Sequence, residues 1–480
     1  MVLHIHRTHK KLKPRLLILL GLAFFACTRA EEKVSVVLVS IDSLRADFCS
    51  PYGHVPLFAK DEQTTPFLQK LADEGVLFES CSAAAPWTLP SHVSILSGAS
   101  PAEHGVRSRK FRMKSDLGLI SEKFQDAGWA TAGFFSAPFL HPTWGFFRGF
   151  DTYEPGPPYL DSLEAAEAMM QRGSRKIQDF HQQADSDKET TPDTLGKAKQ
   201  WLEQGDKWKE PFFLFIHLWD PHYDYEPPAH YAQRFHPGYE GPVDGTGFND
   251  DTGKWGPDDL DHFKALYEAE IRYTDDHLAA FFAQLQEWGL DNKVIFAVVS
   301  DHGDEFAEHG QLGHHKTLYE EVMRVPMIIR APGSVPAGTR IKGTVSNYDL
   351  APTLLDLAGL QPWSGKSGQS LRSLWETADA SRDVLMDLLH PGRGLDLQGW
   401  RWNSHKAILD RRRGSLTMFD LAEDPGEHQP NAQTNSPAFP QKDRAMSFFQ
   451  ETAQRSAKGA VMEESAEMIR ILEELGYTGG

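Results

Sequence analysis

The stretch "VSVVLVSID", residues 34–42, is a continuous run of apolar and β-branched residues that ends in the carboxylate of Asp42. A run without polar alternation is typical of a strand that is buried on both faces of a parallel sheet. Two further runs have the same character, "FFLFIHL" at 212–218 and "KVIFAVVS" at 293–300. The sequence therefore predicts a sheet with at least these three strands at its centre.

Each of these strands ends next to side chains that can bind a metal or take part in catalysis. Asp42 ends the first, Asp220 and His222 follow the second, and Asp301 and His302 follow the third. In α/β sheets, ligands bind beyond the carboxyl ends of the strands. We therefore expect these acids and histidines to converge at one edge of the sheet.

Helical patterns alternate with the strands. "TTPFLQKLADEG" (64–75) has a Thr start, an early Pro and a terminal Gly, and 258–289 is a long helical stretch. Further strands are predicted at 76–83 and 325–329. Strands that alternate with helices predict an α/β fold, a sandwich around a mixed, mainly parallel sheet.

The pattern changes near residue 376, from which short strand-like segments lead to a final predicted helix at 462–476. We expect a main domain over 34–375 and a small α+β subdomain over 376–480. Residues 233–257 are rich in Gly, Pro and Asp and lack the periodicity of a helix or strand. Such a long loop is typical of an active-site lid or of a mobile segment.

Composition excludes several classes of protein. The 480 residues are 40% hydrophobic, which is ordinary for a globular protein, and the net charge of −18 disfavours nucleic acid or an anionic membrane surface as a partner. Beyond Cys27, only Cys49 and Cys81 remain, too few for a disulfide framework or a zinc cage. They could form one optional disulfide at most.

The first 27 residues are predicted to be a signal peptide and not part of the fold. Basic residues at 10–15 precede the apolar run 16–26, which is short for a membrane span. The run ends at Cys27, roughly as a bacterial lipoprotein signal ends, so a lipid anchor at Cys27 and an ordinary cleaved signal remain as alternatives. Export to the periplasm or cell envelope follows from either.

"PWTLPSHVSILSG" (86–98) predicts a helix over 89–97 with Thr88 at its N-terminus. Thr88 is a good N-cap, because its oxygen can accept a backbone N–H. The same place suits a nucleophile, since a helix N-terminus stabilises an anion. The two roles are compatible.

Seven blocks of the sequence follow one another in a characteristic order: "SIDSLRAD" (40–47), "TTPFLQKLADEGVLFESCSAAAPWTLPSHVSILSG" (64–98), "PFFLFIHLWDPHYDYEPP" (211–228), "SDHGDEFAEHGQLGHHKTLYEEVMRVPMII" (300–329), "YDLAPTLLDLAGL" (348–360), "LTMFDLAEDPGE" (416–427) and "LEELGY" (472–477). In this order they resemble the sulfatase family of the alkaline-phosphatase superfamily. The resemblance implies that family's three-layer fold and a metal-dependent ester hydrolase.

Asp42, Thr88, Asp301 and His302 carry the implied metal site. This set resembles the nucleophile-side metal site of the superfamily's phosphodiesterases and its phosphoglycol or phosphoethanolamine transferases. Oxygen-rich ligation with one histidine suits Ca, Mn or Mg, and a second site with histidine would favour Zn. Asp220 with Asp224 is a candidate for such a second site.

The resemblance also implies residues that contact an anionic ester substrate. His222 matches the family's substrate-contacting histidine, and His314, His315 and Lys316 fall where the family places a cationic group on the bound oxyanion or leaving group. Two further residues are predicted to bind substrate: His92, which replaces the family's arginine, and Asp220.

Departures from the family pattern bear on the reaction. Sulfatases carry Cys or Ser, oxidised to formylglycine, where this chain has Thr88. Their paired aspartates become Asp42-Ser43, their Asp-Asn becomes Asp301-His302, and "GFFSAP" (133–138) replaces Gly-Lys-x-His. Several groups that hold sulfate in the family are therefore missing.

The chemistry of a plain alcohol favours phosphorus over sulfur. A formylglycine hydrate expels sulfate by re-forming its aldehyde, whereas a sulfated threonine has no such exit; a phosphothreonine can be cleared by water or an acceptor alcohol at a metal centre. We expect a hydrolase or transferase acting on phosphate or phosphonate esters, above all diesters. A sulfuric ester hydrolase with an atypical site and a non-catalytic binding protein are the alternatives.

Overall fold

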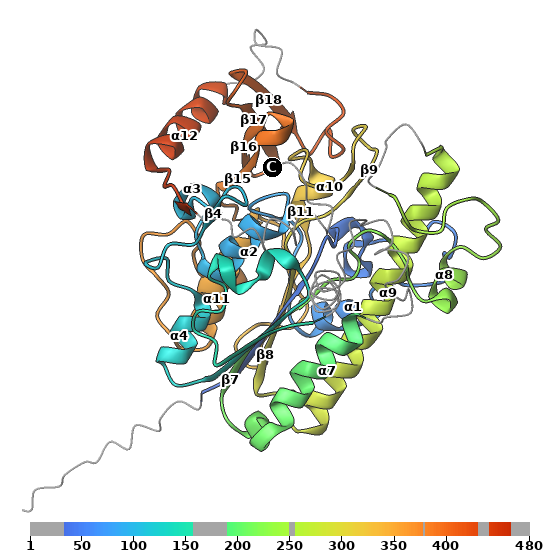
Figure 1. The fold of residues 1–480 in the computed structure, drawn as a ribbon. Coiled ribbons are helices and arrows are strands. Elements are labelled where there is room, and N and C mark those ends of the chain that lie inside the picture. The colour runs from blue at the N-terminus through green and yellow to red at the C-terminus, as the bar shows by residue number, and fades with distance from the viewer. Residues whose placement is uncertain (1–32, 157–189, 249–254, 378–379, 431–440, 462–480) are drawn as a thin grey trace, which may run out of the picture. The chain divides into compact units, whose positions relative to one another are not determined.

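The computed structural model describes residues 33–156, 190–248, 255–377, 380–430 and 441–461. The described residues from Val34 onward belong to one compact unit. At its centre lies an eight-stranded sheet with the order β13-β2-β12-β8-β1-β7-β5-β6 (Figure 1). Its strands are β1 (Ser35–Ile41), β2 (Val76–Phe78), β5 (Ala130–Phe135), β6 (Thr152–Pro155), β7 (Phe212–Leu218), β8 (Val294–Ser300), β12 (Met327–Arg330) and β13 (Thr339–Ile341).

Most neighbours in this sheet are parallel. β1 pairs in parallel with both β7 and β8, and β5 pairs in parallel with β6 and β7. β12 is antiparallel to β8 and β2. The predicted mixed, mainly parallel sheet is confirmed.

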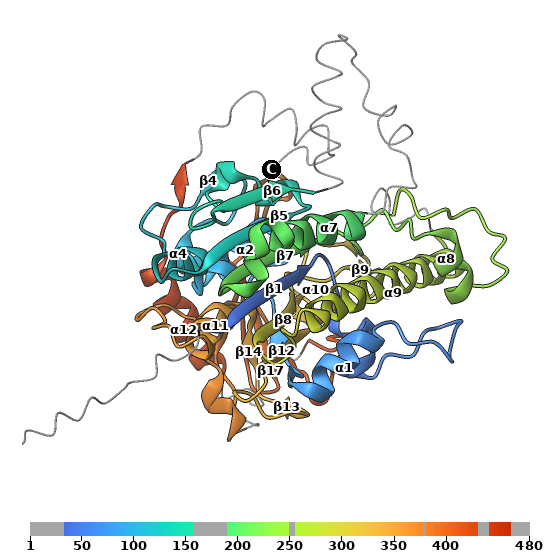
Figure 2. The same ribbon diagram turned by 90° about the horizontal axis from the view of Figure 1, so that it is seen from below.

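The side chains of β1 alternate between two cores on opposite faces of the sheet. Val36 and Leu38 belong to one core, and Val37, Val39 and Ile41 to the other; all are buried. Both faces are covered, which explains the uninterrupted apolar run. One face carries α2 (Thr88–Ser97), α4 (Ile120–Asp126) and α11 (Leu350–Leu357), and the other carries α1 (Pro66–Glu74), α7 (Thr190–Glu203) and α9 (Pro257–Glu287) (Figure 2). The three-layer sandwich is confirmed.

The single strand predicted at 76–83 is wrong in detail, because the chain turns at Glu79. β2 ends at Phe78, and β3 (Cys81–Ser82) joins a separate three-stranded sheet with β11 (Arg324–Val325) and β14 (Val345–Ser346). The guanidinium of Arg324 donates two hydrogen bonds to the carbonyl of Glu79 and fixes this break. β3 then leads the chain to Thr88.

The C-terminal part contains a four-stranded antiparallel sheet, as an α+β subdomain requires. The strands are β15 (Val384–His390), β16 (Leu395–Trp402), β17 (His405–Asp410) and β18 (Ser415–Asp420), and α12 (Lys442–Arg455) packs on them. The boundary at 375/376 stays a prediction. The helix predicted at 462–476 lies outside the described residues.

The remaining short elements connect these layers. They are α3 (Pro101–His104), β4 (Phe111–Arg112), α8 (Ala229–Phe235), β9 (Glu305–Phe306), β10 (Leu312–Gly313), α10 (Glu320–Met323) and β19 (Ala460–Val461). The predicted lid at 233–257 is described only in part, because 249–254 lie outside the described residues. Cys49 and Cys81 are buried free thiols, so the optional disulfide is not formed. Across the described ranges, we find no helix with the length and apolar character needed to cross a membrane.

Helix α1 is capped by a residue more than two hundred positions away in sequence. Its N-cap, Thr65, makes no side-chain capping hydrogen bond. Instead, Asp275 of α9 accepts hydrogen bonds from the backbone N–H of Phe67 (2.7 Å) and of Leu68 (3.0 Å). Asp275 is 2% exposed, so it joins α1 to α9 within the apolar layer between them.

Replacing Asp275 with Ala should lower the free energy of unfolding by roughly 2–4 kcal/mol, because two backbone N–H groups lose their acceptor in a buried place. Urea denaturation followed by circular dichroism measures this change. Asp276→Ala is the matched control; its side chain is 34% exposed and pairs with Arg272, so its effect should stay within about 1 kcal/mol. Equal losses in the two variants would contradict the capping role.

Candidate active site

Asp42 and Asp301 lie side by side, directly after the ends of two neighbouring strands. β1 and β8 are parallel neighbours in which Ile41 pairs with Ser300, and each aspartate is the next residue in its chain. His302 follows Asp301 at the same edge. The predicted convergence of acids and histidine beyond these strand ends is confirmed.

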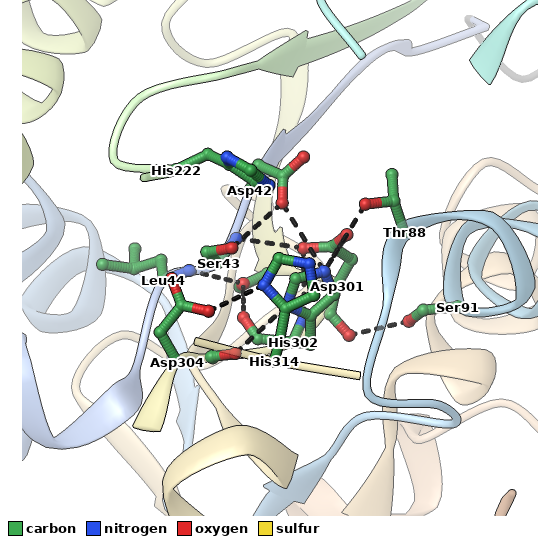
Figure 3. A network of polar contacts seen from close by, with 12 residues as sticks. Asp42, Ser43, Leu44, Thr88, Ser91, His222, Asp301, His302, Asp304 and His314 are labelled. Atoms are coloured by element: carbon green, nitrogen blue, oxygen red, sulfur yellow. Dashed lines mark hydrogen bonds and ion pairs between the residues drawn. The ribbon is translucent and has the colours of Figure 1, made fainter. Parts of the chain in front are cut away.

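His302 lies at the centre of this group (Figure 3). Its Nε2 atom is 3.2 Å from Asp301 Oδ2, 3.6 Å from Asp42 Oδ1 and 3.5 Å from Thr88 Oγ1. The side chains of Asp42, Asp301 and His302 are fully buried, and Thr88 is 4% exposed. The structure thus brings together all four residues predicted to bind the metal.

Burial makes this group unfavourable without a cation. Burial raises the pKa of Asp42, and the negative charge of Asp304 raises it further. Burial also raises the pKa of Asp301, with the charge of Asp42 adding to the effect. Burial lowers the pKa of His302, as does the neighbouring His314. Two adjacent carboxylates beside a neutral imidazole form an electrostatic trap for a dication.

The donor atoms fit a divalent metal. Asp42 Oδ2 and Asp301 Oδ2 are buried and accept no hydrogen bond from the described residues. The Nδ1–H group of His302 faces the carbonyl of Gly303 at 3.2 Å, which leaves Nε2 free to face the carboxylates. Ligand atoms of Asp42, Asp301 and His302 lie within 4.8 Å of one another. Two carboxylates and one imidazole are compatible with Ca, Mn, Mg or Zn.

Thr88 is not the N-cap that the sequence predicted. Helix α2 begins at Thr88 itself, and Trp87 is the N-cap, without a side-chain capping hydrogen bond. The hydroxyl of Thr88 is therefore not used by the helix, and it points toward His302 (Figure 3). It stands at the positive end of a ten-residue helix, where an anionic oxygen is stabilised.

Two residues that sequence reasoning missed hold the aspartates in place. Ser43 has a positive φ of 55°; its backbone N–H donates to Asp301 Oδ1 (3.2 Å) and its hydroxyl to Asp42 Oδ1 (3.3 Å). His217, inside β7, places Nε2 at 3.2 Å from Asp42 Oδ2. His217 pairs with Ser40 of β1, and only this register, which the sequence does not give, places it near Asp42.

His92 lies beneath the site and is fully buried. Its Nδ1 atom is 2.9 Å from the carbonyl of Thr88 and 3.5 Å from Asp301 Oδ2, and its Nε2 atom is 2.9 Å from Ser40 Oγ. This placement favours support of α2 and Asp301, and it differs from the predicted contact with substrate.

His222 and His314 lie on another side of His302. The ring centroids of His314 and His302 are 4.2 Å apart, and those of His222 and His314 are 5.2 Å apart. Asp304, which sequence reasoning also missed, accepts from His314 Nδ1 (2.7 Å) and from the hydroxyl of Tyr225 (2.9 Å). The predicted catalytic residues His222 and His314 are thus adjacent to the metal-binding group.

The two residues after His314 make other contacts. His315 stacks on Trp87 and lies against His390, with ring centroids 4.5 and 4.4 Å away. Lys316 donates to the carbonyl of Leu312 (2.5 Å), and burial lowers its pKa to about 8.

Asp220 is used at the start of α7. Its Oδ2 atom accepts from the hydroxyl and backbone N–H of Thr191 and from the hydroxyl of Thr190. Asp224 accepts from the backbone N–H of Gly247 (2.9 Å). Neither residue belongs to a group of three or more potential metal ligands among the described residues, so the second metal site suggested for Asp220 and Asp224 stays a prediction.

Comparison with known proteins decides the family. The family model described as Sulfatase matches residues 35–360, and the model "N-sulphoglucosamine sulphohydrolase, C-terminal" matches 307–441. The chain belongs to the sulfatase family. It is a sulfatase-like hydrolase of the alkaline-phosphatase superfamily, a family whose members generally bind a divalent metal.

Named relatives match about three quarters or more of this chain. An arylsulfatase of Clostridium perfringens is 25% identical over 82% of this chain and 89% of its own. An N-acetylglucosamine-6-O-sulfatase of Bacteroides thetaiotaomicron is 25% identical over 74% of each chain. The crystal structure of a phosphonate monoester hydrolase of Agrobacterium radiobacter has a TM-score of 0.72 at 21% identity, covering 88% of this chain and 96% of that one. This last similarity shows the shared fold.

Asp301→Ala should lose the metal, because it removes a carboxylate from the centre of the trap. Elemental analysis of protein purified without chelator measures the content. Asp220→Asn is the control: its side chain serves α7 and not the metal group, so its metal content should equal that of the parent. Equal metal content in Asp301→Ala and the parent would contradict the assignment.

Proposed function

We propose that this chain is an exported metal-dependent hydrolase of phosphate and phosphonate esters, with diesters preferred and Thr88 as the nucleophile. The observation that carries the proposal is the hydroxyl of Thr88, which starts α2 and faces the group formed by Asp42, Asp301 and His302. Export is supported by the basic and apolar character of the first 27 residues.

A threonine in this position supports phosphorus chemistry. The hydroxyl has no second oxygen through which a bound sulfuryl group could be expelled, whereas an enzyme-bound phosphoryl group can be displaced by water. When bound, the metal supplies positive charge for the non-bridging oxygens and makes the contacting hydroxyl more acidic. The N-terminus of α2 adds partial positive charge at the same place.

The proposed reaction has two steps, transfer of the phosphoryl group to Thr88 and then from Thr88 to water. Thr88 Oγ1 forms a bond to phosphorus while the bond to the leaving oxygen breaks, and the hydroxyl proton ends on the leaving alcohol. Water then attacks phosphorus, the bond to Thr88 breaks, and Thr88 recovers a proton. An alcohol in place of water gives transfer instead of hydrolysis.

His222 and His314 are the groups placed to contact the substrate beside Thr88. Burial lowers the pKa of His222 to about 4, and it also lowers the pKa of His314 well below the usual range. Both rings are therefore neutral at pH 7 and can exchange hydrogen bonds with an ester or leaving oxygen. The retained Asp42, Asp301 and His302 count against a pure binding role.

A substrate panel tests the reaction class. We expect kcat/KM to be highest for an aryl phosphodiester or an aryl phosphonate monoester, lower for a phosphomonoester, and lowest for an aryl sulfate, because the site lacks the family's route for sulfate release. All activity should be lost on metal removal and return with metal. An aryl sulfate as the best substrate, hydrolysed in a Thr88-dependent way, would instead establish an atypical sulfatase.

Thr88→Val keeps the shape of the side chain without its hydroxyl, so it should lower kcat/KM by several orders of magnitude. Thr88→Ser retains a hydroxyl and should keep much of the activity. Acid quench of the parent during turnover of the best substrate, followed by intact and peptide mass analysis, should show a covalent phosphoryl group on Thr88. Full activity of Thr88→Val would show that Thr88 is not the nucleophile.

A further inference from the structure

A basic cluster joins the main domain to the turn between β15 and β16, and its members are His315, Lys316, His390 and Arg393. The ring of His315 stacks on Trp87, at 4.5 Å between centroids, and lies 4.4 Å from the ring of His390. Trp87 directly precedes Thr88, while His390 ends β15 and Arg393 lies in the turn that follows. The turn is thus two ring contacts away from the residue that precedes Thr88.

His315 is held in a backbone conformation that few residues other than glycine adopt. Its φ is 66°, and its backbone N–H donates to the carbonyl of Pro86 (2.9 Å). Its Nε2 atom is buried and has no hydrogen-bond partner among the described residues. A strained backbone and an unpartnered nitrogen both cost free energy, and this combination is typical of a residue with a function.

His390 presents a hydrogen-bond donor. Its Nδ1 atom accepts from the backbone N–H of Arg393 (3.3 Å), so the ring proton of the neutral form is on Nε2. No described residue accepts this proton, and the side chain is only partly buried. Burial lowers the pKa of His390, and the positive charge of Arg393 lowers it further. The ring is therefore neutral at pH 7 and can donate Nε2–H to an anion.

The basic groups of the cluster act on one another. Burial lowers the pKa of His315, and Arg393 and Lys316 are among the groups that lower it further. Arg109 and Lys316 add to the effect of Arg393 on His390. Burial lowers the pKa of Lys316 to about 8, with Arg393 adding to the effect. Positive charges so close to one another repel unless an anion lies among them.

The carboxylates of the β15–β16 hairpin are already paired with arginines outside the cluster. The contacts are those of Asp387 and Asp396 with Arg107 and Arg411. A further arginine lies against the turn, because a Cβ on Gly394 would be 2.9 Å from Nη1 of Arg412. Among the described residues, neither Arg393 nor Arg412 has an ion-pair partner. The turn therefore carries positive charge without a matching carboxylate, in a chain whose net charge is −18.

We propose that this basic cluster binds a second anionic group of the substrate, a carboxylate, sulfate or phosphate carried beside the ester that reacts at Thr88. A guanidinium offers such a group two parallel N–H donors, and the Nε2–H of His390 adds another. The substrate class is then an ester with a second acidic group, whose charge fixes its orientation at the metal. The inference rests on the proposed function for the reacting ester, but it concerns only the group bound at the turn.

A matched series of substrates tests this site. 4-Nitrophenyl phenyl phosphate is compared with analogues that carry a carboxylate or a sulfonate on the phenyl ring, directly or through a short chain, so that the leaving group stays the same. We expect kcat/KM of the parent to be roughly 10-fold higher for the best anionic analogue, because one charged hydrogen bond is worth about that factor. A ratio near one for the whole series would overturn the proposal.

Variants at the turn locate the effect. Arg393→Gln should bring the ratio close to one, because the side chain stays polar and loses its charge. Arg393→Lys should keep part of the preference, and Arg393→Glu should reverse it. The ratio cancels any general loss of activity, so a merely structural role of Arg393 would leave it unchanged.

Arg413→Gln is the matched control. Arg413 is 83% exposed and pairs with Asp410 (3.7 Å), and it follows Arg412, so it lies near the same turn with its charge already balanced. This variant should keep the ratio of the parent. An equal fall of the ratio in Arg413→Gln and Arg393→Gln would indicate general attraction by positive charge, and the proposed site would be wrong.

Binding without turnover separates this inference from the proposed function. Calorimetric titration of the metal-loaded protein with 4-carboxyphenylphosphonate and with phenylphosphonate should give a Kd roughly 10-fold lower for the carboxylate in the parent, and equal values in Arg393→Gln. If the diesters are not hydrolysed but this difference is found, the proposed reaction is wrong and the second anion site stands. If the diesters are hydrolysed in a Thr88-dependent way and neither Kd nor kcat/KM differs, the reaction stands and the site is wrong.

Discussion

The parallel register of β1 and β8 is the constraint on which the site depends, because it forces the carboxylates of Asp42 and Asp301 together in a place without solvent. Such a pair is unfavourable unless donors and positive charge surround it. Ser43 donates to both, and the backbone N–H of His302 donates to Asp301 Oδ1 (2.9 Å). These hydrogen bonds satisfy one oxygen of each carboxylate, and the other oxygens are left for a cation. Metal binding and the stability of this edge of the sheet are therefore linked.

The sequence predicts what is local to each strand. Asp42, Asp301 and His302 are identified by their place directly after a buried run, which needs no knowledge of the partner strand. His217 could not be found in this way, because a single histidine within an apolar strand looks like an ordinary core residue until the register places it beside Asp42. Asp220 is the opposite case: it stands in a suitable block, but its Oδ2 atom accepts hydrogen bonds from the start of α7, which only the structure reveals.

A shift of one residue at a helix boundary changes the chemistry of Thr88. An N-cap hydroxyl is occupied by the backbone of its own helix, whereas a hydroxyl on the first helical residue is free. Helix boundaries inferred from a single sequence are uncertain by this amount. The sequence thus predicted the position of Thr88 and the wrong local hydrogen bonding for it, since the contact with His302, which follows β8, joins residues more than two hundred positions apart.

The C-terminal sheet is joined to α10 of the main domain by a buried ion pair. Its Lys406 is fully buried between Glu320, at the start of α10, and Glu427, with N–O distances of 3.1 and 3.0 Å. A buried ion pair of this kind adds little net stability compared with apolar packing, but it fixes one arrangement because any other leaves a charge unpaired. The segment so fixed directly follows the hairpin of β9 and β10, after which His314 enters the site. The family model of the C-terminal part begins within that hairpin, at residue 307, so the same match spans His314 and the C-terminal sheet.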